Sequence, residues 1–198
     1  MTDNISQDDL KEFYNKGALA FEKKNYDYAI EIFSQILSSK YDHLEARRYL
    51  HLSLRNKAGD SAVSSITKAL NSTNRLIMML PVEAMLKKDK ISSALENLEK
   101  ILAKNPRDIE VLKKISDIFY KKGLVVNALQ NLEEAKEIDP GNEKILKRLG
   151  ELYLKVEDYK NGKANFEAAL KINPNDTDVL KSLKNLDALG TIQKEFNQ

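Results

Sequence analysis

Side chains that most often carry out catalytic or metal chemistry are scarce in this sequence. It contains two histidines, His43 and His51, and no cysteine. Neither histidine lies near a set of carboxylates at metal-ligand spacing, and a chain without thiols has no disulfide, thiolate nucleophile or cysteine-based zinc site. Gly17, Gly150 and Gly162 stand singly rather than in a glycine-rich loop that cradles phosphate. We therefore expect no enzyme activity, no metal site and no cofactor.

The charged residues indicate no reaction either. The sequence has 30 acidic and 32 basic residues, and the formal charge of +2 offers no strong field to nucleic acid or to an anionic membrane. No pair of carboxylates stands in an apolar setting that would raise a carboxyl pKa. The lysines at 87–90 and 121–122 fall at predicted turns, where they complement helix dipoles. We expect no nucleic-acid partner.

The apolar segments are short. Residues 1–9 are polar and acidic, without the basic start and apolar stretch of a signal peptide. The longest apolar cluster, Leu76–Leu80, is far too short to cross a bilayer. We therefore expect no membrane insertion and a cytoplasmic protein.

The elements that position these residues are predicted to be helices. The chain has only 4 prolines and 7 glycines, so most of it must be regular. Apolar residues recur at steps of three and four, as in Leu112, Ile115 and Phe119. No stretch alternates as a half-buried strand does. The predicted fold class is all-α.

The helices are predicted to come in repeats. Pro106, Pro140 and Pro174 are evenly spaced, and each is followed at the second position after it by Asp or Asn. A proline there ends one helix, and the Asp or Asn caps the next. A fixed period of about 34 residues is the signature of a helical repeat array.

Further columns of residues share this register, with a shortening of one or two residues around the second repeat. Small residues stand at Ala29, Ala62, Ala94, Ala128 and Gly162. Four positions later stand Phe33, Ile66, Leu98, Leu132 and Phe166. Three positions further on stand Ile36, Ala69, Ile101, Ala135 and Ala169. Twelve positions before the small residues stand Gly17, Leu50, Val82, Ser116 and Gly150. Each unit is therefore predicted to be a hairpin of two closely approaching helices, and neighbouring hairpins must stack to bury their apolar faces.

These columns resemble the tetratricopeptide repeat (TPR) family. The fifth unit carries its pattern in order at Leu146, Leu149, Gly150, Tyr153, Tyr159, Phe166, Ala169 and Pro174. The resemblance implies a stand-alone, bacterial-type array over 1–190, a right-handed superhelical solenoid of five TPR helix hairpins with a C-terminal capping helix. The predicted repeats are 10–42, 43–74, 75–108, 109–142 and 143–176, followed by a capping helix at 177–189 and a tail at 191–198.

Two stretches depart from the pattern. In the second and third repeats Leu50 and Val82 stand where the family usually has a small residue. Asn71–Asn74 is predicted to be a polar break between these repeats, and Pro81 either starts a shortened helix after it or kinks a longer one. Gly190 is predicted to end the capping helix, beyond which the chain frays.

The resemblance also implies a binding surface, because in this family the first helix of each hairpin lines the concave face. Helical spacing along those helices gives a predicted partner-binding groove of Tyr14, Phe21, Arg47, His51, Leu54, Met79, Leu86, Lys113, Tyr120 and Lys147. Its N-terminal half is apolar and aromatic, which is typical of a binding site. The alternative is that the degenerate repeats pack irregularly and bury these residues themselves.

The predicted function follows from this surface. We expect a protein–protein interaction scaffold or adaptor that binds a peptide or helix of a partner protein, whose identity the sequence does not give. The alternative is self-association into an oligomeric scaffold. One subtype of the family grips a carboxylate chain end with lysines and asparagines on successive first helices. Tyr14, Ala18 and Met79 stand at three of these places, so the sequence disfavours that mode.

Overall fold

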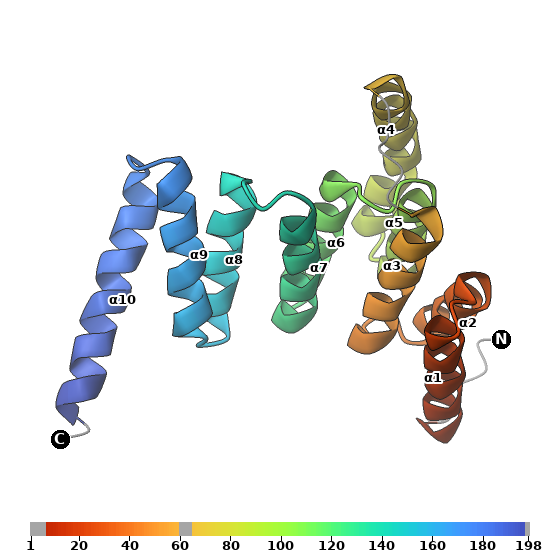
Figure 1. Ribbon diagram of the computed structural model, residues 1–198, viewed down its shortest axis with the longest axis horizontal. Helices are drawn as coiled ribbons and strands as arrows, with labels where there is room; N and C mark the ends of the chain where they lie inside the picture. The colour runs from red at the N-terminus through yellow and green to blue at the C-terminus, as the bar shows by residue number, and fades with distance from the viewer. Residues whose placement is uncertain (1–6, 60–64, 197–198) are drawn as a thin grey trace. The chain divides into compact units, whose positions relative to one another are not determined.

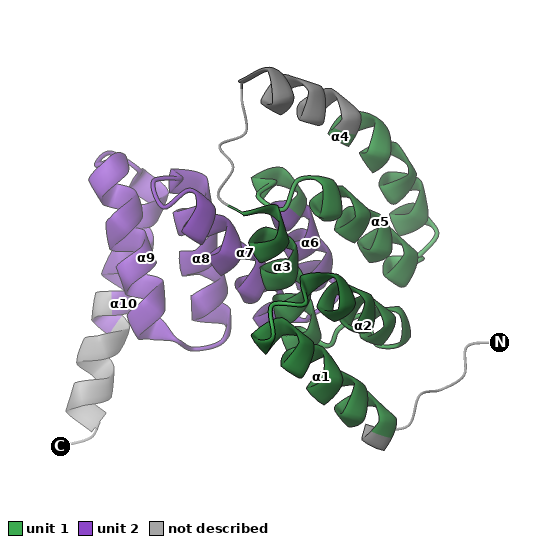
Figure 2. Ribbon diagram, turned by 45° about the vertical axis from the view of Figure 1, so that its right-hand side comes forward, with its two compact units in different colours: residues 1–111 green, residues 112–198 purple. Residues whose placement is uncertain are grey.

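Helices occupy most of the chain because the apolar residues recur with helical spacing and few residues break a helix. The computed structural model describes residues 7–59 and 65–196, and within these ranges there are ten helices and no strand. The chain divides into two compact units, 1–111 and 112–198, which we describe separately (Figure 2). The predicted all-α helical repeat fold is confirmed.

The first unit contains α1 (Gln7–Glu22), α2 (Tyr26–Ser39), α3 (Leu44–Ala58), α4 (Ser65–Lys87) and α5 (Ile91–Lys104) (Figure 1). The pairs α1–α2 and α4–α5 are hairpins, and α3 packs against α2. Helix α6 (Ile109–Lys121) begins in this unit and continues into the second. The second unit also contains α7 (Val125–Ile138), α8 (Glu143–Lys155), α9 (Tyr159–Ile172) and α10 (Thr177–Phe196).

The repeat is visible in the tight turns inside the hairpins. Lys24, Asp89, Gly123 and Glu157 have positive φ angles, and the last three of these are spaced evenly, as the three prolines are. A residue in this conformation ends the first helix and reverses the chain over a few residues. The turns therefore repeat with the period that the prolines predict.

The helices of a hairpin approach each other through a small residue. A Cβ atom built on Gly17 would lie 2.8 Å from Cζ of Phe33, and one built on Gly150 would lie 2.5 Å from Cε1 of Phe166. Such distances leave no room for a side chain, so the aromatic ring packs directly on the backbone of the first helix. This contact explains why small residues recur in that column.

The last hairpin is covered by α10. Val179 and Leu186 of α10 pack on Leu146, Phe166 and Ala169 in a single apolar cluster. The helix continues past Gly190 to Phe196, so the predicted helix end at 189 and the predicted tail from 191 are wrong. Residues 197–198 lie outside the described residues. A glycine inside a helix costs only about 1 kcal/mol relative to alanine, so it does not by itself end one.

The predicted break between the second and third repeats is also wrong. Helix α4 runs without interruption through 71–74 and through Pro81, which neither starts it nor ends it. Pro81 removes the backbone donor that would bond the carbonyl of Ile77. Both residues are exposed on the helix, so the freed carbonyl is accessible to hydrogen bonds from water. The repeat boundary at 74/75 therefore falls inside one helix, and the other boundaries stay predictions.

The aromatic contact in the last hairpin gives a test of the fold. Phe166 is 1% exposed, so replacing it with alanine should lower the free energy of unfolding by about 3–5 kcal/mol. Val126→Ala, at an exposed position of α7, should change it by less than about 0.5 kcal/mol. Urea unfolding followed by circular dichroism measures both. Equal effects of the two substitutions would mean that Phe166 is not a core residue.

Candidate binding groove

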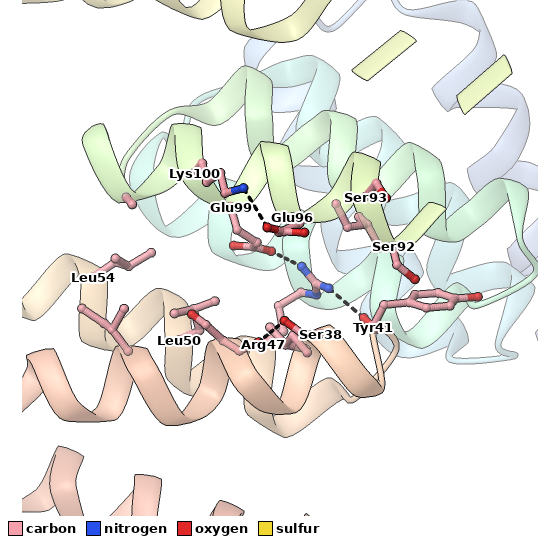
Figure 3. A pocket seen from close by; sticks show the side chains of 15 residues that line it. Ser38, Tyr41, Arg47, Leu50, Leu54, Ser92, Ser93, Glu96, Glu99 and Lys100 are labelled. Carbon is pink, nitrogen blue, oxygen red and sulfur yellow. Dashed lines mark hydrogen bonds and ion pairs between the residues drawn. The ribbon is translucent and has the colours of Figure 1, made fainter. Parts of the chain in front are cut away.

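A groove lies between α2, α3 and α5 in the first unit, with a volume of about 380 Å³ (Figure 3). We call it the α2–α3–α5 groove. Its apolar lining residues are Ile30, Leu37, Leu50, Leu54, Leu95 and Ala103. Its polar and charged lining residues are Ser34, Ser38, Tyr41, Arg47, Ser92, Ser93, Glu96, Glu99 and Lys100.

Helical spacing explains how each wall is built. Ile30, Ser34 and Leu37 lie three and four residues apart on α2, so they share one face of that helix. Leu50 and Leu54 of α3 are related in the same way, and the lining residues of α5 recur from Ser92 to Ala103. Each helix therefore contributes one stripe, and the three stripes face a common space.

A buried charge cluster closes one side of the groove. The Arg47 guanidinium, 1% exposed, donates from Nη1 to Oε1 of Glu99 and from Nη2 to the carbonyl of Tyr41, the latter at 2.7 Å. Nε2 of His51 lies 2.7 Å from Oε2 of Glu99. Since an ionised carboxylate only accepts hydrogen bonds, Nε2 carries the proton in this contact. The cluster ties α3 to α5 and to the turn after α2.

The cluster sets the charge of Glu99. Burial alone raises the pKa of a carboxyl group, but His51 and Arg47 outweigh it and hold the pKa of Glu99 below its ordinary value of 4.5. Glu99 is therefore ionised at neutral pH and balances the charge of Arg47. The groove thus has a charged wall whose side chains are already engaged with each other, next to an apolar floor.

Of the ten residues predicted to face a partner, Arg47, His51 and Leu54 are buried. Arg47 and Leu54 line the α2–α3–α5 groove, and His51 lies behind it against Glu99. Their burial is what the alternative in the sequence analysis expects, and whether they contact a partner stays a prediction.

Tyr14 and Phe21 lie in an aromatic cluster of the first two repeats. The ring of Tyr49 is 5.8 Å from that of Tyr14 and 5.3 Å from those of Phe21 and Phe33. Burial, together with Tyr49 and Glu45, raises the pKa of Tyr14 to about 12, so its hydroxyl stays protonated. Both predicted residues are half-buried, and their rings support the packing of α1, α2 and α3.

Met79 and Leu86 are half-buried on α4, and Lys113 is half-buried on α6. In the second unit Tyr120 lies under the Arg148 guanidinium, whose carbon is 4.3 Å from the ring centre. That these residues share one surface with those of the first unit stays a prediction.

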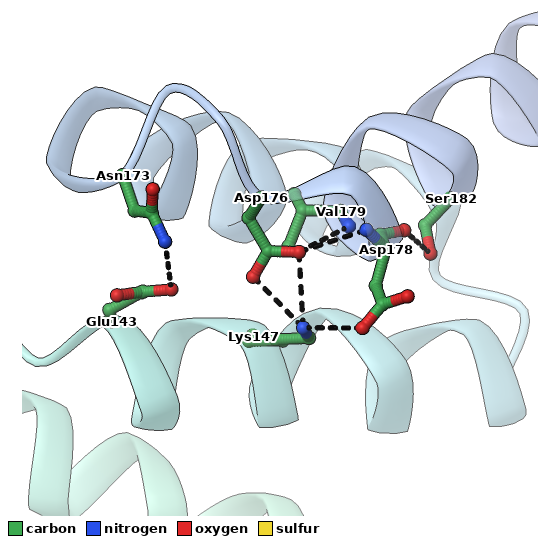
Figure 4. A network of polar contacts seen from close by, with 7 residues as sticks. All are labelled: Glu143, Lys147, Asn173, Asp176, Asp178, Val179 and Ser182. Atoms are coloured by element: carbon green, nitrogen blue, oxygen red, sulfur yellow. Dashed lines mark hydrogen bonds and ion pairs between the residues drawn. The ribbon is translucent and has the colours of Figure 1, made fainter.

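Lys147 joins α8 to the start of α10 (Figure 4). Its Nζ lies 2.9 Å from Oδ2 of Asp176 and 3.2 Å from Oδ2 of Asp178. Asp176 also accepts hydrogen bonds from the amides of Asp178 and Val179 at the first turn of α10. Lys147 therefore holds the capping helix in place, a role that the sequence analysis did not assign to it.

Sequence reasoning missed the contribution of the second helices, α2 and α5, to the groove. Glu99 directly follows Leu98, which belongs to one of the buried columns of the repeat. From that position alone we would expect Glu99 to be a solvent-exposed carboxylate at the edge of the packed face. Its partners are 48 and 52 residues away in the chain, so no local pattern pairs them.

In the described ranges no group of three or more His, Asp or Glu is placed to hold a metal ion. No helix of the described chain is long and apolar enough to cross a membrane.

Residues 144–176 match the family model described as tetratricopeptide repeat. Among solved structures, the first TPR of Spaghetti (RPAP3) bound to the HSP90 peptide SRMEEVD aligns with a TM-score of 0.51 and 15% identity, covering 59% of this chain and 92% of that one. The Sgt2 TPR domain from Aspergillus fumigatus aligns with a TM-score of 0.49 and 20% identity, covering 61% of this chain and 80% of that one. The MamA protein aligns with a TM-score of 0.48 and 13% identity, covering 94% of this chain and 85% of that one. At these identities the likeness to the Spaghetti domain shows the fold alone. No curated protein matches in sequence.

The charge cluster gives a prediction about stability and pH. Glu99→Gln leaves the buried Arg47 without its counter-charge, so the free energy of unfolding should fall by about 3 kcal/mol at neutral pH. The folded-state pKa of Glu99 is lowered from its ordinary value of 4.5. The ionised Glu99 carboxylate therefore stabilises the folded state at pH values above 4.5, and this stabilisation is lost as the pH falls through the folded-state pKa. The difference between wild type and variant should therefore shrink in acid.

Urea unfolding at about pH 7 and about pH 3 measures this difference. Glu96→Gln is the matched control, because Glu96 is an exposed residue of the same helix paired with Lys100. It should change stability by less than about 0.5 kcal/mol at either pH. A Glu99→Gln effect that does not depend on pH would contradict the assignment of the charge.

Proposed function

We propose that this chain is a tetratricopeptide repeat protein and that it acts as a protein-interaction scaffold, which binds a peptide or helical segment of a partner protein. The observation that carries the proposal is the α2–α3–α5 groove, which combines an apolar floor with polar edges. Ligand pockets in proteins have volumes of about 300–1,000 Å³, and this groove, at about 380 Å³, lies in that range.

The shape and chemistry of the groove favour an amphipathic segment. The leucines of the floor accept apolar side chains spaced along one face of a partner helix, which is how helix-in-groove recognition works. The serines at its edges offer hydroxyl groups to backbone or polar side chains of the same segment. Lys100 and Glu96 are exposed beside them and carry opposite charges, so they favour a partner of mixed charge.

The proposed ligand is not an acidic chain end. The Spaghetti domain was solved with an HSP90 peptide, but the places of the carboxylate-gripping residues hold Tyr14, Ala18 and Met79 in this chain. Tyr14 is already engaged by neighbouring rings. Partner contacts at Met79, Leu86, Lys113, Tyr120 and Lys147 stay predictions.

Self-association is the second candidate function, and one observation favours it. Leu76, Ile77 and Leu80 are 65%, 63% and 72% exposed on α4, and neighbouring exposed apolar residues of this kind are typical of contact surfaces. Light scattering at rising protein concentration separates this candidate from a monomeric adaptor. A chain that stays monomeric at high concentration contradicts self-assembly.

Filling the groove should abolish partner binding. Ala103 lines the groove on α5 and is exposed, so Ala103→Trp places an indole in the groove without disturbing the core. Quantitative co-purification and mass spectrometry should show at least a roughly tenfold loss of a specific partner, which corresponds to about 1.4 kcal/mol of binding free energy.

Ala164→Trp, at an exposed position on α9 of the other unit, is the control and should bind as wild type does. Circular dichroism melting must show that both variants are folded. Unchanged partner recovery with Ala103→Trp would move the binding site to another surface.

A further inference from the structure

An apolar strip runs along the solvent side of α4. Leu76, Leu80 and Ala84 lie four residues apart, Ile77 lies beside them, and all four side chains are exposed. Residues at this spacing share one face of a helix. We call this strip the α4 ridge. Exposed apolar residues that adjoin one another in this way are typical of a contact surface, whereas single exposed ones are ordinary.

The α4 ridge points away from the helix on which α4 packs. Met78 and Met85 of α4 meet α5, where their sulfur atoms lie 3.7 Å from Nζ of Lys104 and 3.5 Å from Nδ2 of Asn97. At about 100° per residue, these two methionines lie on the opposite side of α4 from Leu80. The wall that α5 gives to the α2–α3–α5 groove lies on another face of α5. The ridge therefore does not reach the groove of its own chain and is open to another molecule.

The α2–α3–α5 groove has the shape and polarity that complement the ridge. Leucines of α2 and α3 form its floor, and helix-in-groove recognition places apolar residues at positions i, i+3 or i+4, and i+7 of the bound helix against such a floor. Ile77, Leu80 and Ala84 have this spacing. A ridge that enters a groove buries more apolar surface than two ridges that meet at their crests. Since the stabilisation grows with the apolar area buried, the groove is a better acceptor for the ridge than a second ridge is.

The charges beside the two surfaces are also complementary. Glu83 and Lys87 are exposed at the C-terminal end of the ridge, one helical turn apart. Glu96 and Lys100 are exposed at the edge of the groove, one turn apart and in the same order along the chain. If α4 of one molecule lies antiparallel to α5 of another, Glu83 faces Lys100 and Lys87 faces Glu96. A parallel arrangement brings like charges together, so the charges favour a second copy in the antiparallel orientation.

We propose that the α4 ridge of one copy docks into the α2–α3–α5 groove of a second copy, with α4 antiparallel to the α5 that it meets. The ridge and the groove are different surfaces, so a docked pair still offers one ridge and one groove, and copies add head to tail. The inference rests on self-association, the second candidate function. It makes the ridge a competitor of any partner segment for the groove.

Two variants, each lacking one of the two surfaces, test the docking. Ile77→Glu places a carboxylate on the ridge and leaves the groove intact, whereas Ala103→Trp fills the groove and leaves the ridge intact. Light scattering should show that the mass of the wild-type chain rises with concentration and that each variant alone associates at least about tenfold more weakly. An equimolar mixture of the two variants should form a dimer and nothing larger, because it contains only one kind of intact ridge–groove pair.

Val126→Glu is the matched control. It places a carboxylate at an exposed apolar position outside the ridge, on α7, and should associate as the wild-type chain does. Circular dichroism must show that every variant is folded. Leu80→Glu takes the place of Ile77→Glu if that variant does not fold, because Leu80 is also an exposed residue of the ridge.

A charge reversal tests the orientation. Lys100→Glu should weaken the association about threefold, because it places two carboxylates opposite each other. Adding Glu83→Lys to the same chain should restore the association, since the two reversed charges then face each other between copies. Stronger association of Lys100→Glu alone would contradict the antiparallel arrangement, because in a parallel one Lys87 faces position 100.

Three outcomes would overturn the docking itself. They are a wild-type chain that stays monomeric at high concentration, an Ala103→Trp chain that still associates alone as the wild type does, and a mixture of the two variants that forms no dimer. These outcomes are distinguishable from a failure of the scaffold function. Ile77→Glu keeps the groove and should recover a foreign partner at least as well as the wild-type chain, whereas unchanged partner recovery with Ala103→Trp contradicts the scaffold function alone.

Discussion

The first and last hairpins depend on one contact, in which a residue of the first helix packs directly against a large apolar residue sixteen positions later. In the first and last repeats this residue is glycine, and the rings of Phe33 and Phe166 lie on its backbone. The distance between the helices is set there, because the interior tolerates neither an added methyl group nor an empty space of that size. The turns and helix caps recur with the same period along the chain as this contact.

The α2–α3–α5 groove lies where this contact is not made. Leu50 occupies the place of the glycines, and the charge cluster of Arg47, Glu99 and His51 joins α5 to α3. The cluster thus supports the walls of the groove and does not fill it.

Periodicity was sufficient to predict the helices, the hairpins and the small-residue columns, because these depend on contacts within a single repeat that recur several times along the chain. It did not predict the ion pair between Arg47 and Glu99, which occurs once and joins distant residues. It also did not predict the ion pair between Lys147 and Asp176, since a lysine at a surface position of a helix looks the same in sequence whatever its acceptor is. Single, non-repeating polar contacts leave no periodic signal.

The error at 71–74 has a different cause, since the local signals there nearly balance. Asparagine, serine and threonine inside a helix cost at most about 0.7 kcal/mol each, and a capping asparagine contributes only about 1 kcal/mol. Neither preference is large enough to decide whether α4 is one helix or two. Burying one side chain the size of isoleucine is worth about 1.5–3 kcal/mol, which exceeds either local preference. Packing between distant residues therefore decides whether this stretch forms one helix or two, and for that reason the local sequence alone did not predict the continuous α4.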